Sequence, residues 1–353
     1  MKIQDVDKNF IVGGVLNEEG IKYYTIPNEN FNLKGVYFDQ EENKFMRIPR
    51  KVAKACSDGV NFLCSNTTGG RVRFSTNSKR FIIKVRYKVF TIMPHFALAG
   101  STGCSLLIDD GDKPVLCKML TPYPDNKNGY AIGIDLDGKM HNYTLYMPLY
   151  NDVESLEIGL EEGAELGLGK PYKNVKPIVY YGSSITQGGC ASRPDSCYQG
   201  IICKKNNVDF INLGFSGNAK GEDAIAEYIA NLDCSLFVYD YDHNAPTIEH
   251  LIATHEKMFK TFREKNKNVP VIIISKPNDN NGKIDMIRKR IIRKTYLNAK
   301  NSGDDNVYFI DGATLYKYNK DFTVDSCHPT DLGFYFMAKR IYKEMCKIDE
   351  KFK

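Results

Sequence analysis

Four short segments of the chain place small residues beside groups capable of nucleophilic or acid–base chemistry. They are Gly182-Ser183-Ser184-Ile185-Thr186-Gln187-Gly188 and the stretches 212–218, 240–246 and 325–333. The first segment follows the apolar run 178–181 directly, and its small residues permit a tight turn from a strand into a helix. Such a turn would expose a serine as a nucleophile. A phosphate-binding turn or an ordinary helix cap favours the same residue types, so this segment alone leaves the chemistry open.

The next two segments offer hydrogen-bond donors. Glycine in the second segment, Asn212-Leu213-Gly214-Phe215-Ser216-Gly217-Asn218, can let a backbone N–H point into a site, as an oxyanion donor must. The Asn244 side-chain amide can supply a second donor to the same oxygen. A plain strand-to-helix turn would also explain the glycine. Helix capping would explain the asparagine, and Pro246 is typical of a helix start.

The fourth segment contains an acid and a base three residues apart, Asp325 and His328. The carboxylate can fix one ring nitrogen while the other takes a proton from a serine. Taken alone, His328 is equally compatible with a cap or a buried structural histidine. The four segments nevertheless follow one another in chain order at element ends, and this conjunction favours a hydrolytic site.

The elements that must position these groups form a parallel sheet. Five short apolar runs are suited to buried strands, at residues 178–181, 210–213, 236–239, 271–274 and 307–310. Amphipathic segments separate them, with one helix face at Ile225, Tyr228, Ile229 and Leu232 and another at Ile248, Leu251, Ile252, His255, Phe259 and Phe262. This alternation predicts a parallel α/β sheet, in which ligands bind beyond the carboxyl ends of the strands.

The first half of the chain has a different period. Phe81, Ile83, Val85, Tyr87 and Val89 alternate with Ile82, Lys84, Arg86 and Lys88, and similar alternation returns at 143–149 and 156–160. Asp110-Gly111 separates two apolar runs as in a hairpin. These patterns predict an antiparallel sandwich over residues 1–165, a linker at 166–175 and a catalytic domain over 176–353.

The four segments resemble the signature blocks of the SGNH (GDSL-like) hydrolase superfamily: a serine block, a glycine block, an asparagine block and an Asp-x-x-His block. The stretch Tyr181-Gly182-Ser183-Ser184-Ile185-Thr186-Gln187-Gly188-Gly189-Cys190-Ala191-Ser192-Arg193-Pro194 and the run Leu145-Tyr146-Met147-Pro148-Leu149-Tyr150 are similar to a subgroup with an N-terminal β-sandwich. The resemblance implies a flavodoxin-like three-layer α/β/α domain with a five-stranded parallel sheet, behind a jelly-roll-like sandwich.

Carried onto this sequence, the resemblance implies Ser184 as nucleophile, His328 as general base and Asp325 as its partner. It also implies an oxyanion hole formed by the backbone N–H groups of Ser184 and Gly217 and the Asn244 amide. Two positions depart from the family pattern, because Ser183 and Ala245 stand where acidic residues are common. The reaction would be ester hydrolysis through an acyl-enzyme, and it requires no metal or organic cofactor.

The subgroup resembles carbohydrate esterases of family 2, so the expected substrate is an O-acetylated sugar. Arg193 follows the nucleophile segment and could contact a polar substrate group, although a surface salt bridge explains it equally well. The alternatives are a lipase-like or thioesterase activity on longer acyl chains and a non-catalytic carbohydrate-binding protein. A metal cluster of Asp240, Asp242, His243 and Asp279 is disfavoured, because oxygen-rich loops are common after strands.

The composition narrows the partners. The net charge is +5 over 353 residues, and the densest basic run, at Arg288-Lys289-Arg290, is predicted to be a solvated helix face beside Ile284, Ile287 and Ile291 and not a nucleic-acid patch. No run is apolar enough for a signal peptide or a membrane span. The ten cysteines lack metal-site spacing and are predicted to be mostly free thiols of a cytoplasmic protein. The oligomeric state stays open.

Overall fold

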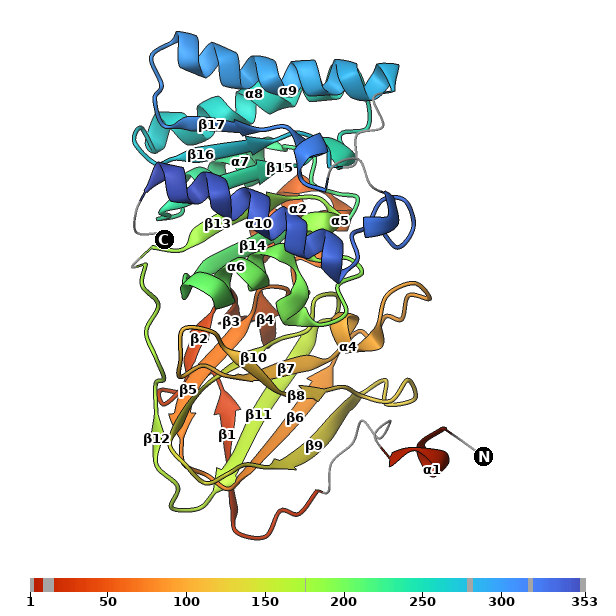
Figure 1. The fold of residues 1–353 in the computed structure, drawn as a ribbon, viewed down its shortest axis with the longest axis vertical. Helices are drawn as coiled ribbons and strands as arrows, with labels where there is room; N and C mark the ends of the chain where they lie inside the picture. Colours follow the sequence, from red (N-terminus) through yellow and green to blue (C-terminus); the bar gives the residue numbers. More distant parts are fainter. Residues whose placement is uncertain (1–2, 9–15, 175, 278–281, 317–319, 350–353) are drawn as a thin grey trace. The chain divides into compact units, whose positions relative to one another are not determined.

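The computed structural model of the protein describes residues 3–8, 16–174, 176–277, 282–316 and 320–349. These residues form two compact units (Figure 1). The first contains the described residues within 1–46, 66–171 and 192–195, and the second contains those within 47–65, 172–191 and 196–353.

The first unit is built on two antiparallel sheets. One sheet has the order β1 (Ile21–Ile26), β11 (Val153–Glu161), β6 (Arg80–Tyr87) and β9 (Gly129–Asp135). The other has the order β12 (Leu166–Gly167), β5 (Arg71–Thr76), β10 (His141–Tyr146), β7 (Cys104–Ile108) and β8 (Val115–Leu120), with β2 (Asn32–Lys34) also paired to β5. A ladder of β3 (Tyr37–Asp39) and β4 (Lys44–Met46) and the short helices α1 (Ile3–Val6) and α4 (Leu98–Ser101) are also described.

The core of this unit lies between the two sheets, and the predicted sandwich is confirmed. Phe81, Ile83 and Val85 of β6 are buried in one cluster with Phe74 and Tyr143 of the opposite sheet. The period-two pattern holds at Lys84 and Arg86, which are not buried, whereas Ile82 is buried on the other side of the strand. The predicted hairpin also forms, because Ile108 of β7 pairs with Val115 of β8.

The second unit contains a five-stranded sheet, and the strands run parallel as predicted. Its order is β14 (Phe210–Gly214), β13 (Ile178–Gly182), β15 (Leu236–Asp240), β16 (Val271–Ile274) and β17 (Val307–Ile310). This is the flavodoxin-like order, in which successive connections leave the first strand in opposite directions. In such sheets ligands bind beyond the carboxyl ends of the strands on either side of that switch point. Here these strands are β13 and β15, where the serine and asparagine segments begin.

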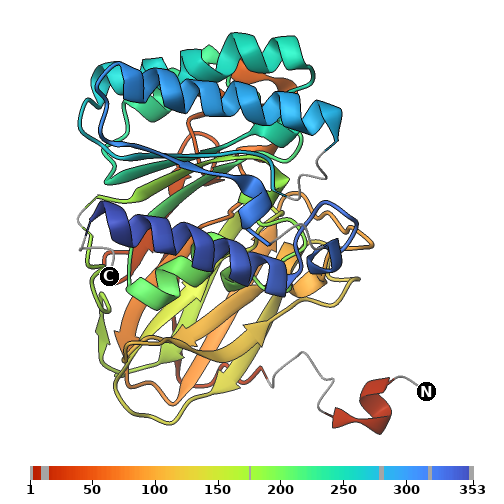
Figure 2. The same cartoon turned by 45° about the horizontal axis from the view of Figure 1, so that its top comes forward.

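Helices cover both faces of the parallel sheet (Figures 1 and 2). The rings of Tyr180 and Phe334 both lie near Tyr198, which places α6 (Tyr198–Asn206) and α10 (Asp331–Ile348) on one face. The other face carries α7 (Asp223–Ala230), α8 (Ile248–Lys265) and α9 (Lys283–Asn301), with Phe262 against Phe237 of β15. The remaining described pieces are short: α2 (Arg50–Cys56), α3 (Asp58–Leu63), α5 (Ser184–Gln187) and the 3-10 turns Pro194–Ser196, Asp242–Asn244, Gly312–Thr314 and Lys320–Phe322.

The division of the chain is less simple than the sequence indicated. Residues 47–65 fall inside the predicted sandwich range, yet they form α2 and α3, and α2 packs on α7 of the second unit. The segment Leu166–Gly167, predicted to begin a linker, adds strand β12 to β5. The two helices escaped prediction because each is under two turns long and shows no extended apolar periodicity.

Two predicted helix faces need correction. Ile252 of α8 is 59% exposed, while Met258 takes a buried position. In α9 the buried residues are Ile292, Thr295 and Ala299, and Ile284 is 63% exposed. Among the described residues, no helix is both long and apolar enough to cross a lipid bilayer.

Candidate active site

The serine segment forms a sharp turn from β13 into the one-turn helix α5. Ser183 caps this helix by accepting a hydrogen bond from the Ile185 backbone N–H, and Ser184 is its first residue. A Cβ on Gly182 would lie 2.0 Å from the Asp240 carbonyl oxygen, so the strand can approach its neighbour this closely only with glycine. The turn therefore fixes Ser184 at the carboxyl end of the central part of the sheet.

The Asp-x-x-His segment is a closed loop just before α10. The Phe322 carbonyl accepts from the Thr330 N–H at 2.8 Å, and the His328 carbonyl accepts from the Val324 N–H at 2.8 Å. Asp325 Oδ1 accepts from the backbone N–H groups of Cys327 and His328, at 3.0 and 2.7 Å. Ser326 takes a φ of +69°, a left-handed conformation unusual for serine, to make this tight turn.

The serine, histidine and aspartate segments converge on one hydrogen-bonded line. Ser184 Oγ lies 2.8 Å from His328 Nε2, and His328 Nδ1 lies 2.7 Å from Asp325 Oδ2. The side chains of His328 and Asp325 are 22% and 33% exposed, while Ser184 is 8% exposed. The structure thus brings together the three residues that the sequence singled out, in an order suited to proton transfer from the hydroxyl.

The charge on Asp325 is secured by its hydrogen bonds. Partial burial acts to raise the pKa of Asp325, but bonds from the His328 ring, the His328 N–H and the Cys327 N–H outweigh it and lower the pKa to about 2. The carboxylate is therefore ionised throughout the neutral range, where it holds the Nδ1 proton of His328 and leaves Nε2 to face the serine.

The glycine segment follows β14 and turns at Gly217, whose φ is +67°. This left-handed conformation favours glycine and is held by the hydrogen bond from the Asn218 N–H to the Phe215 carbonyl, 2.9 Å long. The Ser216 N–H donates to Gln187 Oε1 at 2.9 Å, which ties the glycine segment to the helix that carries Ser184.

Asn244 is connected to the same glycine segment. Its Oδ1 accepts a hydrogen bond from the Ala219 N–H at 3.2 Å, which fixes the orientation of the side-chain amide. The turn that carries it is held by Arg288 of α9, whose Nε donates to Asp242 Oδ1 at 2.7 Å and whose Nη2 donates to the Ala245 carbonyl at 3.0 Å. Arg288 also donates to the Asp242 carbonyl.

Arg288 corrects one sequence prediction. Its side chain is only 11% exposed, so it does not belong to a solvated helix face. It lies on the buried side of α9 because positions 288, 292, 295 and 299 follow one another at helical spacing. Because Arg288 and Thr295 are polar, no apolar stripe marks this side of the helix in the sequence. Lys289 likewise contacts Asp311, with 3.1 Å between Nζ and Oδ1.

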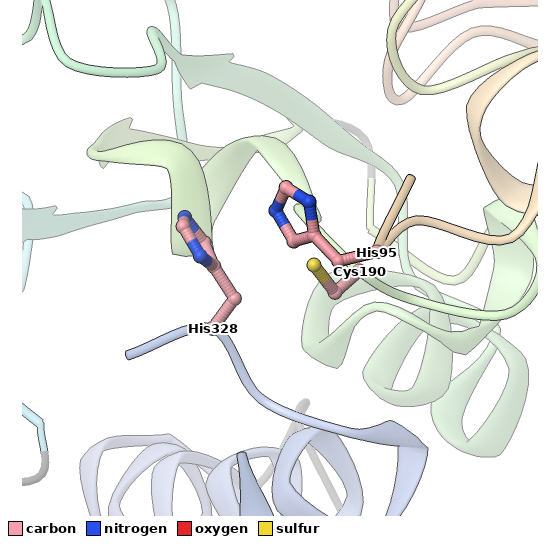
Figure 3. Close-up of side chains that lie close together, drawn as sticks. All are labelled: His95, Cys190 and His328. Carbon is pink, nitrogen blue, oxygen red and sulfur yellow. The ribbon is translucent and has the colours of Figure 1, made fainter. Parts of the chain in front are cut away.

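Cys190 lies beside His328 (Figure 3), with its sulfur within 4.8 Å of an imidazole nitrogen. Burial, with the charges of Asp325 and Cys327 adding, raises the pKa of Cys190 to about 12. The thiol is therefore neutral near pH 7 and a poor nucleophile compared with a thiolate. Burial also lowers the pKa of His243 to about 3, so this second ring close to the site is uncharged.

The remaining candidates have other partners. Arg193 pairs with Asp195, with 3.3 Å between Nε and Oδ1, but that carboxylate is buried, so the pair is not the surface salt bridge that the sequence suggested as an alternative. Of the disfavoured metal cluster, Asp279 lies outside the described residues. Asp242 is engaged by Arg288 and by the Lys276 N–H. Burial, with the nearby Asp242 adding, holds the pKa of Asp240 well above its usual range. Because Arg288 and the Lys276 N–H already occupy the two oxygens of Asp242, this carboxylate is poorly placed to be a cation ligand.

Two family models match the chain. The GDSL-like lipase/acylhydrolase family matches residues 175–346, and the N-terminal domain of SGNH-hydrolase-type esterases matches residues 21–166. A search among curated proteins gave no match.

Solved structures of similar architecture cover nearly the whole chain. A protein assigned as a GDSL-like lipase from Bacteroides ovatus is 27% identical over 93% of this chain and 98% of its own, with a TM-score of 0.81. The salicylyl-acyltransferase of a tetracycline biosynthetic pathway is 17% identical over 94% and 98%, with a TM-score of 0.76. A family two carbohydrate esterase from Cellvibrio japonicus is 10% identical over 94% and 99%, with a TM-score of 0.63. The last two likenesses concern the fold alone.

A parallel sheet with a serine, a histidine and an aspartate aligned at its carboxyl edge defines an α/β acylhydrolase architecture. With both family matches, the chain belongs to the SGNH (GDSL-like) hydrolases, in the group with an N-terminal β-sandwich domain.

Proposed function

We propose that the protein is a serine esterase that removes O-acetyl groups from carbohydrates through a Ser184–His328–Asp325 triad. The observation that carries the proposal is the 2.8 Å contact between Ser184 Oγ and His328 Nε2, with Nδ1 bound to a carboxylate of depressed pKa. This geometry suits a serine activated by a general base.

In the acylation step, Ser184 Oγ attacks the ester carbonyl carbon while His328 Nε2 takes the hydroxyl proton. The C=O π pair moves to the carbonyl oxygen, and the backbone N–H groups of Ser184 and Gly217 and the Asn244 amide stabilise this oxyanion. Collapse of the tetrahedral intermediate breaks the bond to the alcohol oxygen, which receives the proton from His328. The sugar leaves with a free hydroxyl, and the acetyl group stays on Ser184.

Deacylation repeats the sequence with water. His328 takes a proton from water as its oxygen attacks the acetyl carbon, and then returns the proton to Ser184 Oγ as acetate departs. Cys190 beside His328 has a pKa raised to about 12, so it does not present a thiolate to the ester near pH 7.

The substrate class is supported by the chemistry of the site segments and by the fold. The segments around Ser184 are rich in Gly, Ser, Asn and Asp, and they offer hydrogen-bonding groups and few long apolar side chains. A lipase-like or thioesterase activity would need an apolar channel for a long acyl chain. The fold shared with a family two carbohydrate esterase agrees with a sugar substrate.

Two assays on the full chain test the proposal. Hydrolysis of 4-nitrophenyl acetate should exceed that of the butyrate and octanoate esters, and acetylated xylo- and manno-oligosaccharides should release acetate. Ser184→Ala should abolish both activities. Preference for octanoate, with no acetate released from the sugars, would favour the lipase-like alternative. Sugar binding with equal background rates for both proteins would favour a carbohydrate-binding protein.

A further inference from the structure

The segment Arg47–Ser65 has no role in the proposed chemistry, yet it folds with the hydrolase unit. It precedes the sheet of that unit by more than a hundred residues, and within the unit α2 packs on α7. We call this segment the brace. Its contacts gather at the end of β14 and on the glycine segment that carries Gly217.

Arg47 makes the first set of contacts. Its side chain is buried, and its Nη1 donates to the Asn212 and Gly214 carbonyls at 3.1 and 2.6 Å. Nη2 donates to the Leu63 carbonyl at 2.7 Å, and the guanidinium carbon lies 4.6 Å from the Phe215 ring centre. A planar guanidinium is suited to bridging carbonyls and stacking on a ring at the same time. Arg47 thereby connects the brace to the Asn212 and Gly214 carbonyls at the end of β14, where the glycine segment begins.

Gly59 in α3 makes the second contact. A Cβ built on Gly59 would lie 2.0 Å from Asn218 Oδ1, so the helix backbone lies directly against that side chain. The Asn218 amide donates to the Ser216 carbonyl at 2.8 Å and so spans the turn at Gly217. Helix α3 of the brace is therefore in close contact with the Asn218 side chain, which bridges the turn at Gly217.

From these two contacts we infer that the brace positions the Gly217 N–H for the oxyanion, with Arg47 and Gly59 as positioning residues. The inference rests on the proposed function. The contacts of Arg47 and Gly59 with the second unit's sheet edge fall on Asn212, Gly214, Phe215 and Asn218, so we expect the brace to act on the oxyanion donor that this segment carries.

The most selective test is a double-mutant cycle in the full chain. Gly59→Ala should lower kcat on 4-nitrophenyl acetate about tenfold, a fraction of the 10²–10³ that loss of a whole oxyanion donor costs, with KM within about twofold. Asn218→Ala removes the side chain that the new methyl group would displace. In that background Gly59→Ala should therefore have little further effect. Additive losses would overturn the inference.

Arg47 provides a second variant pair. Arg47→Met should lower kcat about tenfold or more and raise the inhibition constant of phenylboronic acid by a similar factor, because the tetrahedral boronate uses the same donors. Arg47→Lys should restore part of both. The pH at half-maximal kcat should stay that of the wild type. Lys54→Met, an exposed change on α2, is the matched control and should leave kcat unchanged.

Hydrogen exchange separates failure of this inference from failure of the proposed function. Amides 213–219 should exchange faster in Gly59→Ala and Arg47→Met than in the wild type, and other peptides of the sheet should not. If the wild type has no esterase activity but the two variants show this faster exchange, the proposed function is disproved while the contact between the brace and the glycine segment is supported. Unchanged exchange at 213–219 in both variants would overturn the brace, whatever the activity.

Discussion

At the scale of single residues, the site consists of one hydroxyl, one imidazole and one carboxylate in line. The types and chain order of these residues were predictable from the sequence, because each lies at the end of an apolar run or before a helical pattern. The distances between them were not, since they depend on the strand order and on the tight loop around Ser326. Sequence also missed Arg47 and Arg288, whose partners are mostly backbone carbonyls that leave no residue pattern.

Asp325 offers the first prediction at this scale. Asp325→Asn should lower kcat on 4-nitrophenyl acetate by about 10²–10⁴, because the amide cannot hold the required His328 tautomer as the carboxylate does. Steady-state kinetics at pH 7.5 measure this, with Asp321→Asn, at an exposed position in the 3-10 turn just before the loop, as the matched control. A wild-type rate in Asp325→Asn would contradict the assigned role.

The lowered pKa of Asp325 also has a consequence for folding. A carboxyl whose folded pKa is depressed stabilises the protein fully above its unfolded value of about 3.9, and this contribution is lost as pH falls toward about 2. The same low pKa keeps Asp325 ionised between pH 7 and 4 in the folded protein. Any loss of activity in that range should therefore not come from protonation of Asp325.

At the scale of elements, helix α9 was predicted correctly, but the wrong face of the helix was expected to be buried. The apolar residues Ile284, Ile287 and Ile291 suggested one face, whereas the buried side follows Arg288, Ile292 and Thr295. An arginine is assigned to solvent by any hydropathy pattern, and only the buried carboxylate of Asp242 reverses that choice. A salt bridge between distant segments is a tertiary feature that periodicity cannot report.

Arg288→Met should therefore lower both the stability and the activity of the protein more than its position in a basic run suggests. Breaking a buried ion pair while leaving its carboxylate in place costs about 3–5 kcal/mol of unfolding free energy. We also expect kcat to fall about tenfold, because the turn that holds Asn244 loses its donors. Urea denaturation and esterase kinetics measure both effects. Arg290→Met, at an exposed position of the same helix, should change neither, and an Arg288 variant as stable as Arg290→Met would refute this role.

The start of β10 carries a pH-dependent contact. His141 is bound on both sides, by Asp110 and by Asp137, with 3.0 Å between Nε2 and the Asp137 carboxylate. These hydrogen bonds, that to Asp110 first, raise the pKa of His141. A raised histidine pKa stabilises the fold fully below its unfolded value of about 6.5, and the contribution is lost as pH rises through the folded value.

His141→Gln should accordingly have a lower Tm than the wild type near pH 5.5, and the difference should shrink as pH rises above 8. Thermal unfolding followed by circular dichroism across this range measures the difference. Added salt should reduce it, because the three side chains are partly exposed. A Tm difference that stays constant with pH would show that the contact acts through packing and not through charge.

At the scale of the whole molecule, the two architectures were predictable because their hydrophobic patterns differ. Apolar residues recur at every second position in the sandwich, whereas short apolar runs alternate with amphipathic helical segments in the hydrolase unit. The assignment of residues 47–65 to the hydrolase unit was not predictable. Helices α2 and α3 are too short to show a period, and no linker-like sequence separates them from the strands of the sandwich. Boundaries drawn along a sequence assume contiguous units, and here the second unit is discontinuous.

All ten cysteines are free thiols in the structure, as their placement in the sequence suggested. Titration with Ellman's reagent in guanidinium should therefore find ten thiols without prior reduction. Dithiothreitol should leave the Tm unchanged, since no cross-link constrains the unfolded chain. Fewer reactive thiols before reduction than after would reveal a disulfide and contradict the prediction.

The most direct test of the central claim is to map where a fluorophosphonate attaches, because that probe needs an activated serine and no knowledge of the substrate. Peptide mass spectrometry should find the label on Ser184, none in Ser184→Ala and little in His328→Ala. Ser183→Ala, which removes only the helix cap next to the nucleophile, should still be labelled. Label on any other residue, or none on the folded wild type, would contradict the assignment of Ser184 as the nucleophile.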